Sequence, residues 1–201
     1  MNEMATYQAI AAIGSAIVGV LKAARPAHDF ESSQFMLNQP GDLQNTPPME
    51  EGLSLYLYRV AFNTTRRNWP ARIGPDGQRF RPSLPLDLHY LLIPWALSAT
   101  KQQQLLGWGM RALEDTPILP SSLLNRFSTD PETFSPTEAV ELVSEPLTLQ
   151  DIVNIWDAFK PNLQISVAYV ARMVLIDSTV TLPDSAPVQT RVFDFGKEAV
   201  S

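Results

Sequence analysis

The residues best suited to chemistry are Asp87 and His89, which lie two positions apart in an apolar segment. If this segment is a β-strand, both side chains share one face, since successive side chains alternate between faces. An Asp–His pair can orient a general base that activates a serine for hydrolysis. The sequence has no GxSxG elbow or comparable setting for a nucleophile. We therefore favour a structural histidine, hydrogen-bonded near a sheet edge, over a hydrolase that uses Asp87 and His89.

Other catalytic and binding chemistries lack the side chains that they require. The 201 residues include no Cys and only two His, which excludes disulfides, thiol nucleophiles and Cys-ligated zinc. Neither a phosphate-binding P-loop motif nor a dinucleotide-binding GxGxxG motif occurs. The carboxylate pairs Glu50 with Glu51 and Glu114 with Asp115 lie in predicted loops or helix ends, without the apolar surroundings of a catalytic pair. We expect no catalytic residues, no metal, no cofactor and no small-molecule substrate.

Charge is distributed unevenly along the chain, whose formal net charge is −6. Residues 59–81 contain six Arg and one Asp, a local charge of +5, whereas residues 114–201 contain thirteen acids and five bases, a local charge of −8. Arginine suits planar, bidentate pairing with carboxylates or phosphates. The acidic total disfavours a general binder of nucleic acids or anionic membranes. The basic segment is either a solvated loop or a docking surface for an acidic face of the next copy in a head-to-tail ring.

We expect the docking surface to combine the basic segment with an apolar cluster near the end of the chain. Residues 191–195 (RVFDF) either add a strand to a neighbour's sheet edge or form part of a frayed terminus. The predicted interface residues are Arg59, Asn63, Arg66, Arg67, Asn68, Arg72, Arg79, Arg81, Val192, Phe193 and Phe195.

Helical periodicity predicts three helices. Apolar residues recur at three- and four-residue spacings over residues 6–24, 100–113 and 148–159. The apolar stretch of the first helix, at 9–21, has thirteen uncharged residues, fewer than the roughly 20 that a membrane span needs. It is therefore predicted to be a core helix, with no direct membrane insertion.

Three local signals refine the second and third helices. Thr100 lies three residues before Gln103, the spacing of a capping box, and Thr148 with Asp151 predicts the start of the third helix. Gly107 and Gly109 lie inside the second helix, which indicates a close backbone approach to a neighbouring element.

Four segments are predicted as strands, at 53–62, 84–97, 139–144 and 165–176. Apolar residues lie on both faces of the first strand, with Leu53, Leu55 and Leu57 opposite Tyr56, Tyr58, Val60 and Phe62, which predicts a central strand. Prolines at both ends of the second strand favour a place near the sheet edge.

The connections complete the predicted architecture. The GPDG sequence at 74–77 predicts the tight turn of a short hairpin. Residues 26–52 and 116–137 are rich in proline or small polar residues and are predicted to be irregular. Strands separated by helices, with some connections too short or irregular for βαβ units, favour an α+β domain with a mixed sheet.

Several blocks occur together in an order that resembles a known family. They are LYRVAFNTTRRN at 57–68, LPLDLHYLL at 84–92, LG at 106–107 with MRALEDTPIL at 110–119, EPLTLQDIVNIW at 145–156 and SVAY at 166–169. The family, long labelled a domain of unknown function, is associated with the cap, or tail terminator, of extracellular contractile injection systems (virulence-cassette and antifeeding-prophage-like particles). The similarity covers about residues 5–177.

The resemblance implies a phage tail-terminator-like domain over residues 1–178, with a mixed β-sheet flanked by helices, and a C-terminal tail at 179–201. It also implies a non-enzymatic protein that forms a hexameric ring on the inner tube protein and the sheath protein, ends their polymerisation and stabilises the extended sheath. The contacts of the extensions found in longer relatives are either missing here or supplied by a second cap protein.

The resemblance also bears on place and on partners. It implies assembly in the cytoplasm, followed by incorporation into a particle that is released or stays inside the cell. The alternative function is a DNA-associated terminator or connector of the phage type, with residues 59–81 toward the nucleic acid. We consider nucleic acid the weaker partner, because few aromatic residues interleave with the arginines.

Overall fold

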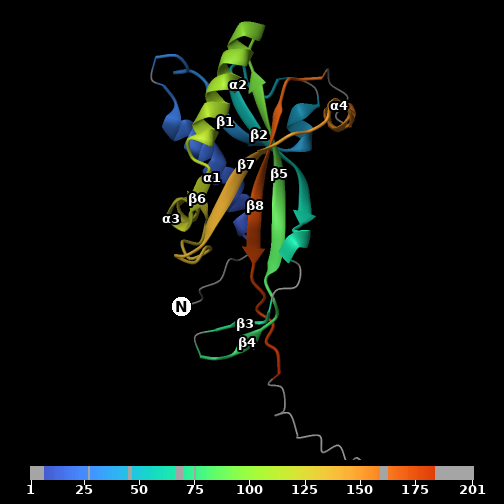
Figure 1. The fold of residues 1–201 in the computed structure, drawn as a ribbon. Helices are drawn as coiled ribbons and strands as arrows, with labels where there is room; N and C mark the ends of the chain where they lie inside the picture. The colour runs from blue at the N-terminus through green and yellow to red at the C-terminus, as the bar shows by residue number, and fades with distance from the viewer. Residues whose placement is uncertain are drawn as a thin grey trace, which may run out of the picture.

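The protein is built on a six-stranded mixed sheet with helices on both faces (Figure 1). The computed structural model describes residues 7–26, 28–44, 47–66, 70–74, 76–158 and 163–183. Its strands follow the order β1-β2-β5-β8-β7-β6, and β3 and β4 form a separate two-stranded hairpin. The β1–β2 pair is parallel, and the other neighbouring strands of the sheet are antiparallel. The predicted α+β class with a mixed sheet is confirmed.

The elements have the following bounds. The strands are β1 (Gln34–Asn38), β2 (Gly52–Phe62), β3 (Arg72–Ile73), β4 (Arg79–Phe80), β5 (Leu84–Trp95), β6 (Ile118–Pro120), β7 (Ala139–Glu145) and β8 (Val167–Ile176). The helices are α1 (Ala9–Ala24), α2 (Ala99–Glu114), α3 (Ser121–Leu124) and α4 (Leu149–Asp157), with 3-10 turns η1 (Pro40–Leu43), η2 (Thr64–Arg66) and η3 (Asn125–Phe127).

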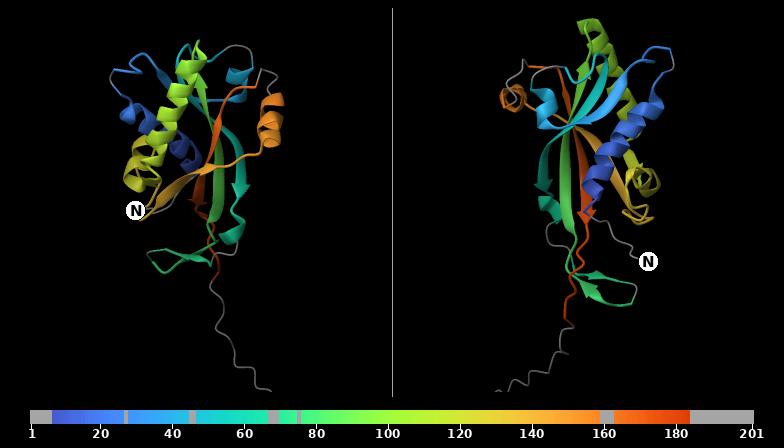
Figure 2. Two further views of the ribbon diagram at one scale, coloured as in Figure 1. Left: turned by 45° about the horizontal axis from the view of Figure 1, so that its top comes forward. Right: turned by 180° about the vertical axis from the view of Figure 1, so that it is seen from behind.

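Each face of the sheet carries its own apolar core. Figure 2 shows α1 and α2 on one side of the sheet, and α4 with η1 on the other. On the α1–α2 face, Ile13 and Ile17 of α1 pack with Leu53 of β2 among fully buried side chains. On the α4 face, Trp156 packs with Ile93 of β5. Burying each large apolar side chain contributes about 1.5–3 kcal/mol, so packing on both faces holds the sheet between the helices.

Several predicted elements are confirmed. They are the first helix from Ala9 onward, the second helix through Glu114, the helix after Thr148, the hairpin around the GPDG turn, and the strands that became β2, β7 and β8. The Thr148 hydroxyl accepts a hydrogen bond from the backbone N–H of Asp151 at 3.2 Å, as the capping spacing predicted. None of the described helices has both the length and the apolar character needed to cross a bilayer.

The predicted edge position of β5 is wrong, because β5 lies between β2 and β8 and is the most buried strand. Its prolines do not break the sheet because both lie next to a strand end. Pro85 is the second residue of β5, and Pro94 lies beyond Leu92, the last residue that pairs with β8. A missing N–H therefore removes no hydrogen bond to β8 at Pro94.

Two further sequence predictions need correction. The segment 26–52 contains β1 and η1, although its sequence has no clear period. Likewise, β6 and α3 lie within the predicted connection 116–137. Helix α2 begins earlier than Thr100, because the hydroxyl of Ser98 accepts from the backbone N–H of Lys101 at 3.1 Å and caps the helix.

A β-bulge divides β2 into two unlike halves. Leu57 pairs with Tyr90 and Arg59 pairs with His89, so Tyr58 is an extra residue. The bulge reverses the alternation, and Val60 and Phe62 therefore lie on the α1–α2 face instead of the opposite face that the sequence predicted. The predicted central position holds only for the first half of β2, since β1 pairs with residues 52–56 alone.

The two glycines of α2 have different surroundings. A Cβ atom at Gly109 would lie 2.6 Å from Cδ1 of Leu53, so the predicted close approach is confirmed there. A Cβ atom at Gly107 would meet no atom within 4 Å, and the predicted close approach is wrong there.

Alanine at these two positions tests the packing of α2 against the sheet. Gly107→Ala should raise the free energy of unfolding by about 1 kcal/mol, because it removes only the helix penalty of glycine. Gly109→Ala should be about 1–3 kcal/mol less stable than Gly107→Ala, because the new methyl group overpacks the core beside Leu53. Urea denaturation of both variants measures the difference, and equal midpoints would contradict the packing.

Candidate assembly surface

The basic segment 59–81 occupies the end of the sheet where β2 and β8 finish and β5 begins. It runs from the second half of β2 through η2 and the β3–β4 hairpin, which extends beyond the sheet (Figure 1). The backbone N–H of Gly74 donates to the carbonyl of Gln78 at 2.8 Å, and that of Gly77 donates to Gly74 at 3.0 Å. Gly77 has a φ of 75°, a conformation that glycine adopts without a steric penalty.

The chain that follows β8 holds the hairpin in place. The backbone N–H of Arg81 donates to the carbonyl of Val180 at 2.9 Å, and the N–H of Leu182 donates to the carbonyl of Arg79 at 2.7 Å. These bonds add a third backbone segment to the hairpin, antiparallel to β4. The basic segment is therefore tied to the exit of β8 by main-chain hydrogen bonds.

A cation–π contact and an ion pair fix one of the predicted interface arginines within the hairpin. The Cζ atom of Arg72 lies 4.4 Å from the centre of the Phe80 ring. Its Nε atom lies 3.6 Å from Oδ2 of Asp177, which follows β8. This guanidinium stabilises the hairpin from within the chain, so it differs from the exposed side chains of Arg59, Arg79 and Arg81.

The other predicted interface residues have different outcomes. Asn63 is engaged within the chain, because its side chain binds Asp87. The backbone of Arg66 belongs to η2. The remaining five lie outside the described residues, and their role stays a prediction: Arg67, Asn68, Val192, Phe193 and Phe195.

The carboxylate of Asp87 connects three strands. It accepts hydrogen bonds from Nδ2 of Asn63 at 3.1 and 3.0 Å and from the backbone N–H of Met173 at 3.1 Å. Arg172 and Met173 form a bulge on β8 opposite Asp87, since Leu86 pairs with Val174 but Leu88 pairs with Ala171. Met173 has a φ of 61°, which is strained for a side chain larger than glycine. The carboxylate compensates for this strain by pairing the amide that the bulge releases.

A second polar cluster lies on the α4 face of the sheet. Nδ1–H of His89 donates to Oε2 of Glu145 at 2.7 Å, and the hydroxyl of Tyr58 donates to the same oxygen at 2.9 Å. Tyr58 reaches this cluster by regular alternation, because it packs on the α4 face as Tyr56 does, opposite Leu57. Burial, and then the hydrogen bond to Glu145, raises the pKa of the Tyr58 phenol above its ordinary value.

The proposed Asp–His pairing does not form. Asp87 binds Asn63 and Met173, His89 binds Glu145, and no described hydrogen bond joins Asp87 to His89. His89 is 7% exposed, so it lies in the sheet and not in an open cleft. It is a structural histidine as expected, but on the central strand and not near an edge.

The basic end of the molecule also exposes large apolar side chains. The exposed fractions are 47% for Val60 and 62% for Phe62 on β2, 70% for Ile73 on the hairpin and 49% for Val180 beside it. Apolar side chains gathered next to charges mark surfaces that bind other proteins. Alternation in the sequence predicts that Val60 and Phe62 lie on a strand covered on both faces, so this exposed apolar surface was not predicted.

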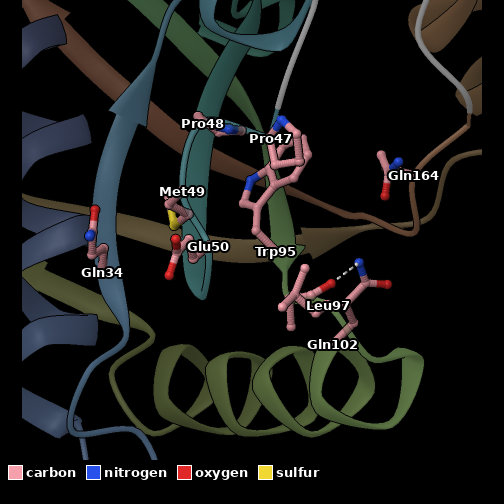
Figure 3. A pocket seen from close by; sticks show the side chains of 10 residues that line it. Gln34, Pro47, Pro48, Met49, Glu50, Trp95, Leu97, Gln102 and Gln164 are labelled. Atoms are coloured by element: carbon pink, nitrogen blue, oxygen red, sulfur yellow. Dashed lines mark hydrogen bonds between the residues drawn. The ribbon is translucent and has the colours of Figure 1, made fainter.

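A pocket of about 640 Å³ lies at the other end of the sheet (Figure 3). Trp95, Met49 and two prolines form its apolar wall, and its polar side chains are three glutamines and Glu50. A single carboxylate without a basic or nucleophilic neighbour provides no acid–base pair. In the described part of the chain, no three His, Asp or Glu side chains gather as a metal site would require.

This combination of fold and surfaces defines a class of protein. A mixed sheet that lies between helices and ends in a basic surface with exposed apolar side chains defines an α+β domain. The chain belongs to the Pvc16 N-terminal domain family, whose model matches residues 12–190. The expected family relationship is therefore confirmed.

Solved structures share the fold along almost all of the chain. The sheath/tube terminator of PVC, an extracellular contractile injection system, in its extended state is similar with a TM-score of 0.60 and 16% identity, over 95% of this chain and 64% of that chain. The tube-terminating cap of the anti-feeding prophage is similar with a TM-score of 0.55 and 14% identity, over 94% of this chain and 59% of that chain. This chain thus spans less than two thirds of either structure. No curated protein matches its sequence.

The Asp87 cluster predicts two opposite effects on stability. Asp87→Ala should lower the free energy of unfolding by about 2–3 kcal/mol, because it leaves the amide of Met173 and the side chain of Asn63 without their acceptor. Met173→Gly should raise it by about 0.5–1 kcal/mol, because glycine adopts the positive φ freely.

The adjacent residue provides the control for Met173→Gly. Arg172→Gly, also in the bulge but without a positive φ, should lower stability by about 0.5–1 kcal/mol, the usual cost of glycine in a strand. Thermal and urea unfolding of the three variants measure these effects. A loss of stability in Met173→Gly equal to that in Arg172→Gly would show that the bulge carries no strain.

Proposed function

We propose that this chain is a structural cap that ends the growth of the inner tube and the sheath in a contractile injection particle and stabilises the extended sheath. The observation that carries the proposal is the shared fold, which covers 95% and 94% of this chain in the two solved terminators. Membership of the Pvc16 N-terminal domain family supports it. The protein acts by its shape and contacts and transforms no substrate. This agrees with the different hydrogen-bond partners of Asp87 and His89, which do not bind each other.

The distribution of charge supports assembly into a closed ring of identical copies, six in number by our proposal. The basic segment continues from β2, whereas β6 and β7 lie at the other side of the sheet. Residues 114–141, around β6 and β7, contain six acidic residues and one basic residue. Opposite charges on opposite sides of one subunit favour head-to-tail contacts, which close into a ring when the rotation between copies permits.

The proposed partners are the inner tube protein, the sheath protein and neighbouring copies of this chain. The solved terminators are longer than this chain, so contacts of their additional parts are either absent here or supplied by a second cap protein. We propose assembly in the cytoplasm and incorporation into a particle. Nucleic acid is not among the proposed partners.

Tube polymerisation tests the capping function. Purified chain added to growing tubes of the cognate tube protein should shorten their final length and leave a ring at one end, because a terminator blocks the surface that adds the next disc. Negative-stain images measure tube length and the presence of rings. The same measurement is repeated with sheath protein present. Tubes that then grow equally long with and without the chain would contradict the proposal.

Charge reversal tests ring closure separately from folding. Arg59→Glu with Arg81→Glu should weaken ring formation about tenfold or more while leaving thermal unfolding within about 0.5 kcal/mol, since both side chains are exposed. Lys22→Glu, an exposed lysine of α1 outside both the basic segment and residues 114–141, is the matched control and should form rings normally.

Reversal of the opposite charges should restore the ring. Adding Glu114→Lys and Glu132→Lys to the doubly reversed variant should recover ring formation if the acidic residues face the basic segment of the next copy. Light scattering after size-exclusion chromatography measures the oligomer. Normal rings in the doubly reversed variant would show that the basic segment serves another contact.

A further inference from the structure

The second half of β2 presents a free strand edge. Residues 57–62 pair with β5 on one side, whereas β1 pairs only with residues 52–56 on the other. No strand in the described ranges covers the remaining edge, and Figure 1 shows this half of β2 outermost at its end of the sheet. An uncovered edge carries backbone N–H and carbonyl groups that can pair with an added strand.

The side chains of this edge form two distinct rows. The bulge at Tyr58 places Val60 and Phe62 on the α1–α2 face, where they are 47% and 62% exposed. It places the exposed Arg59 on the opposite face. An added strand that matches this edge therefore needs two apolar residues on one face and an acidic residue on the other.

The sequence of this chain contains such a strand. Residues 191–195 read RVFDF, so Phe193 and Phe195 alternate with Asp194. When the two phenylalanines lie beside Val60 and Phe62, Asp194 falls on the face of Arg59. The match concerns both the apolar row and the charge, and it holds for parallel and antiparallel pairing alike.

The course of the chain favours an acceptor in a second copy. After β8, residues 180–182 run along β4, and the segment continues past the hairpin, away from the six-stranded sheet (Figure 1). Residues 184–190 then separate Pro183 from Arg191, a span of up to about 25 Å when extended. That reach is sufficient to cross to a neighbouring subunit, whereas a return to its own β2 requires the chain to reverse past the hairpin.

We propose that residues 191–195 of one copy add a strand to the 57–62 edge of β2 in the next copy. Phe193 and Phe195 then cover Val60 and Phe62, and Asp194 pairs with Arg59. This inference rests on the proposed ring, because it assigns one contact between its subunits. It gives the C-terminal tail the task of linking neighbours in a fixed direction around the ring.

Cross-linking tests the contact directly, since the natural chain has no cysteine. One full-length variant carries Ala61→Cys and another carries Val192→Cys, both on the Arg59 face of the proposed pairing. A short bismaleimide is added that bridges directly opposite or diagonal neighbours, about 5–8 Å apart. The mixture should give covalent pairs of chains that contain one copy of each variant. Ala139→Cys, on β7, replaces Ala61→Cys in the matched control and should give none.

The apolar row and the identity of the acceptor have separate tests. Adding Phe193→Ser and Phe195→Ser to the Val192→Cys variant should reduce the cross-linked product about tenfold or more, because their burial is lost. A variant that carries both Ala61→Cys and Val192→Cys should form covalent oligomers, because each subunit is linked to the next. If it forms only an internally linked monomer, the acceptor is its own β2 and the proposal is overturned.

The outcome also separates this inference from the proposed function. Rings that form without the cross-link would overturn the strand addition and leave the cap intact as a proposal. Cross-links between β2 and a cysteine-bearing sheath or tube protein, in place of the tail, would likewise overturn it. Absence of both rings and cross-links would count against the strand addition and the ring together.

Discussion

The hydrogen bonds to the Asp87 carboxylate determine the shape of the end of the molecule that carries the basic segment. This one side chain binds the exit of β2 through Asn63 and the bulge of β8 through the amide of Met173. Bulges lie on both neighbours of β5 at nearly the same height, and bulges increase the local twist of a sheet. The twist and the placement of the hairpin beyond the sheet therefore depend on a half-buried polar contact whose three partners come from distant parts of the sequence.

Two clusters of polar residues that resemble catalytic groups instead stabilise the fold. Glu145 joins His89 to Tyr58 across the sheet on the α4 face, as Asp87 joins Asn63 to the β8 bulge. Each cluster pairs groups that would be costly to bury without a partner. Both clusters use residues from the sequence blocks that resemble the cap family, so the resemblance reflects how the sheet is held together as much as how it meets other proteins.

The sequence predicted most of the fold because the two periodicities and the capping signals are local. Helices α1, α2 and α4 and strands β2, β5, β7 and β8 follow from them. Strand order does not follow from local signals. The prolines of β5 suggested an edge strand, because the sequence does not show that β8 stops pairing before Pro94. Likewise, β1 has no periodic signal, and its five residues form a strand only because β2 offers them a partner.

The candidate surface was predictable in charge but not in detail. The clustering of arginines is visible in the sequence, whereas the engagement of Arg72 with Asp177 and Phe80, and of Asn63 with Asp87, depends on contacts between distant residues. The bulge at Tyr58 was also invisible, since a single extra residue changes the face of every residue after it. That change exposes Val60 and Phe62 at the edge where we propose a neighbouring copy to bind.

The central claim is that the chain is a subunit of a ring that closes one end of a tube and its sheath. Cryo-electron microscopy of intact particles that carry a small tag on this chain tests it most directly. The account predicts tag density in a single ring at one end of each particle, with the basic side of each subunit against the acidic side of the next. Tag density along the whole sheath, or its absence from particles of normal length and integrity, would contradict the account.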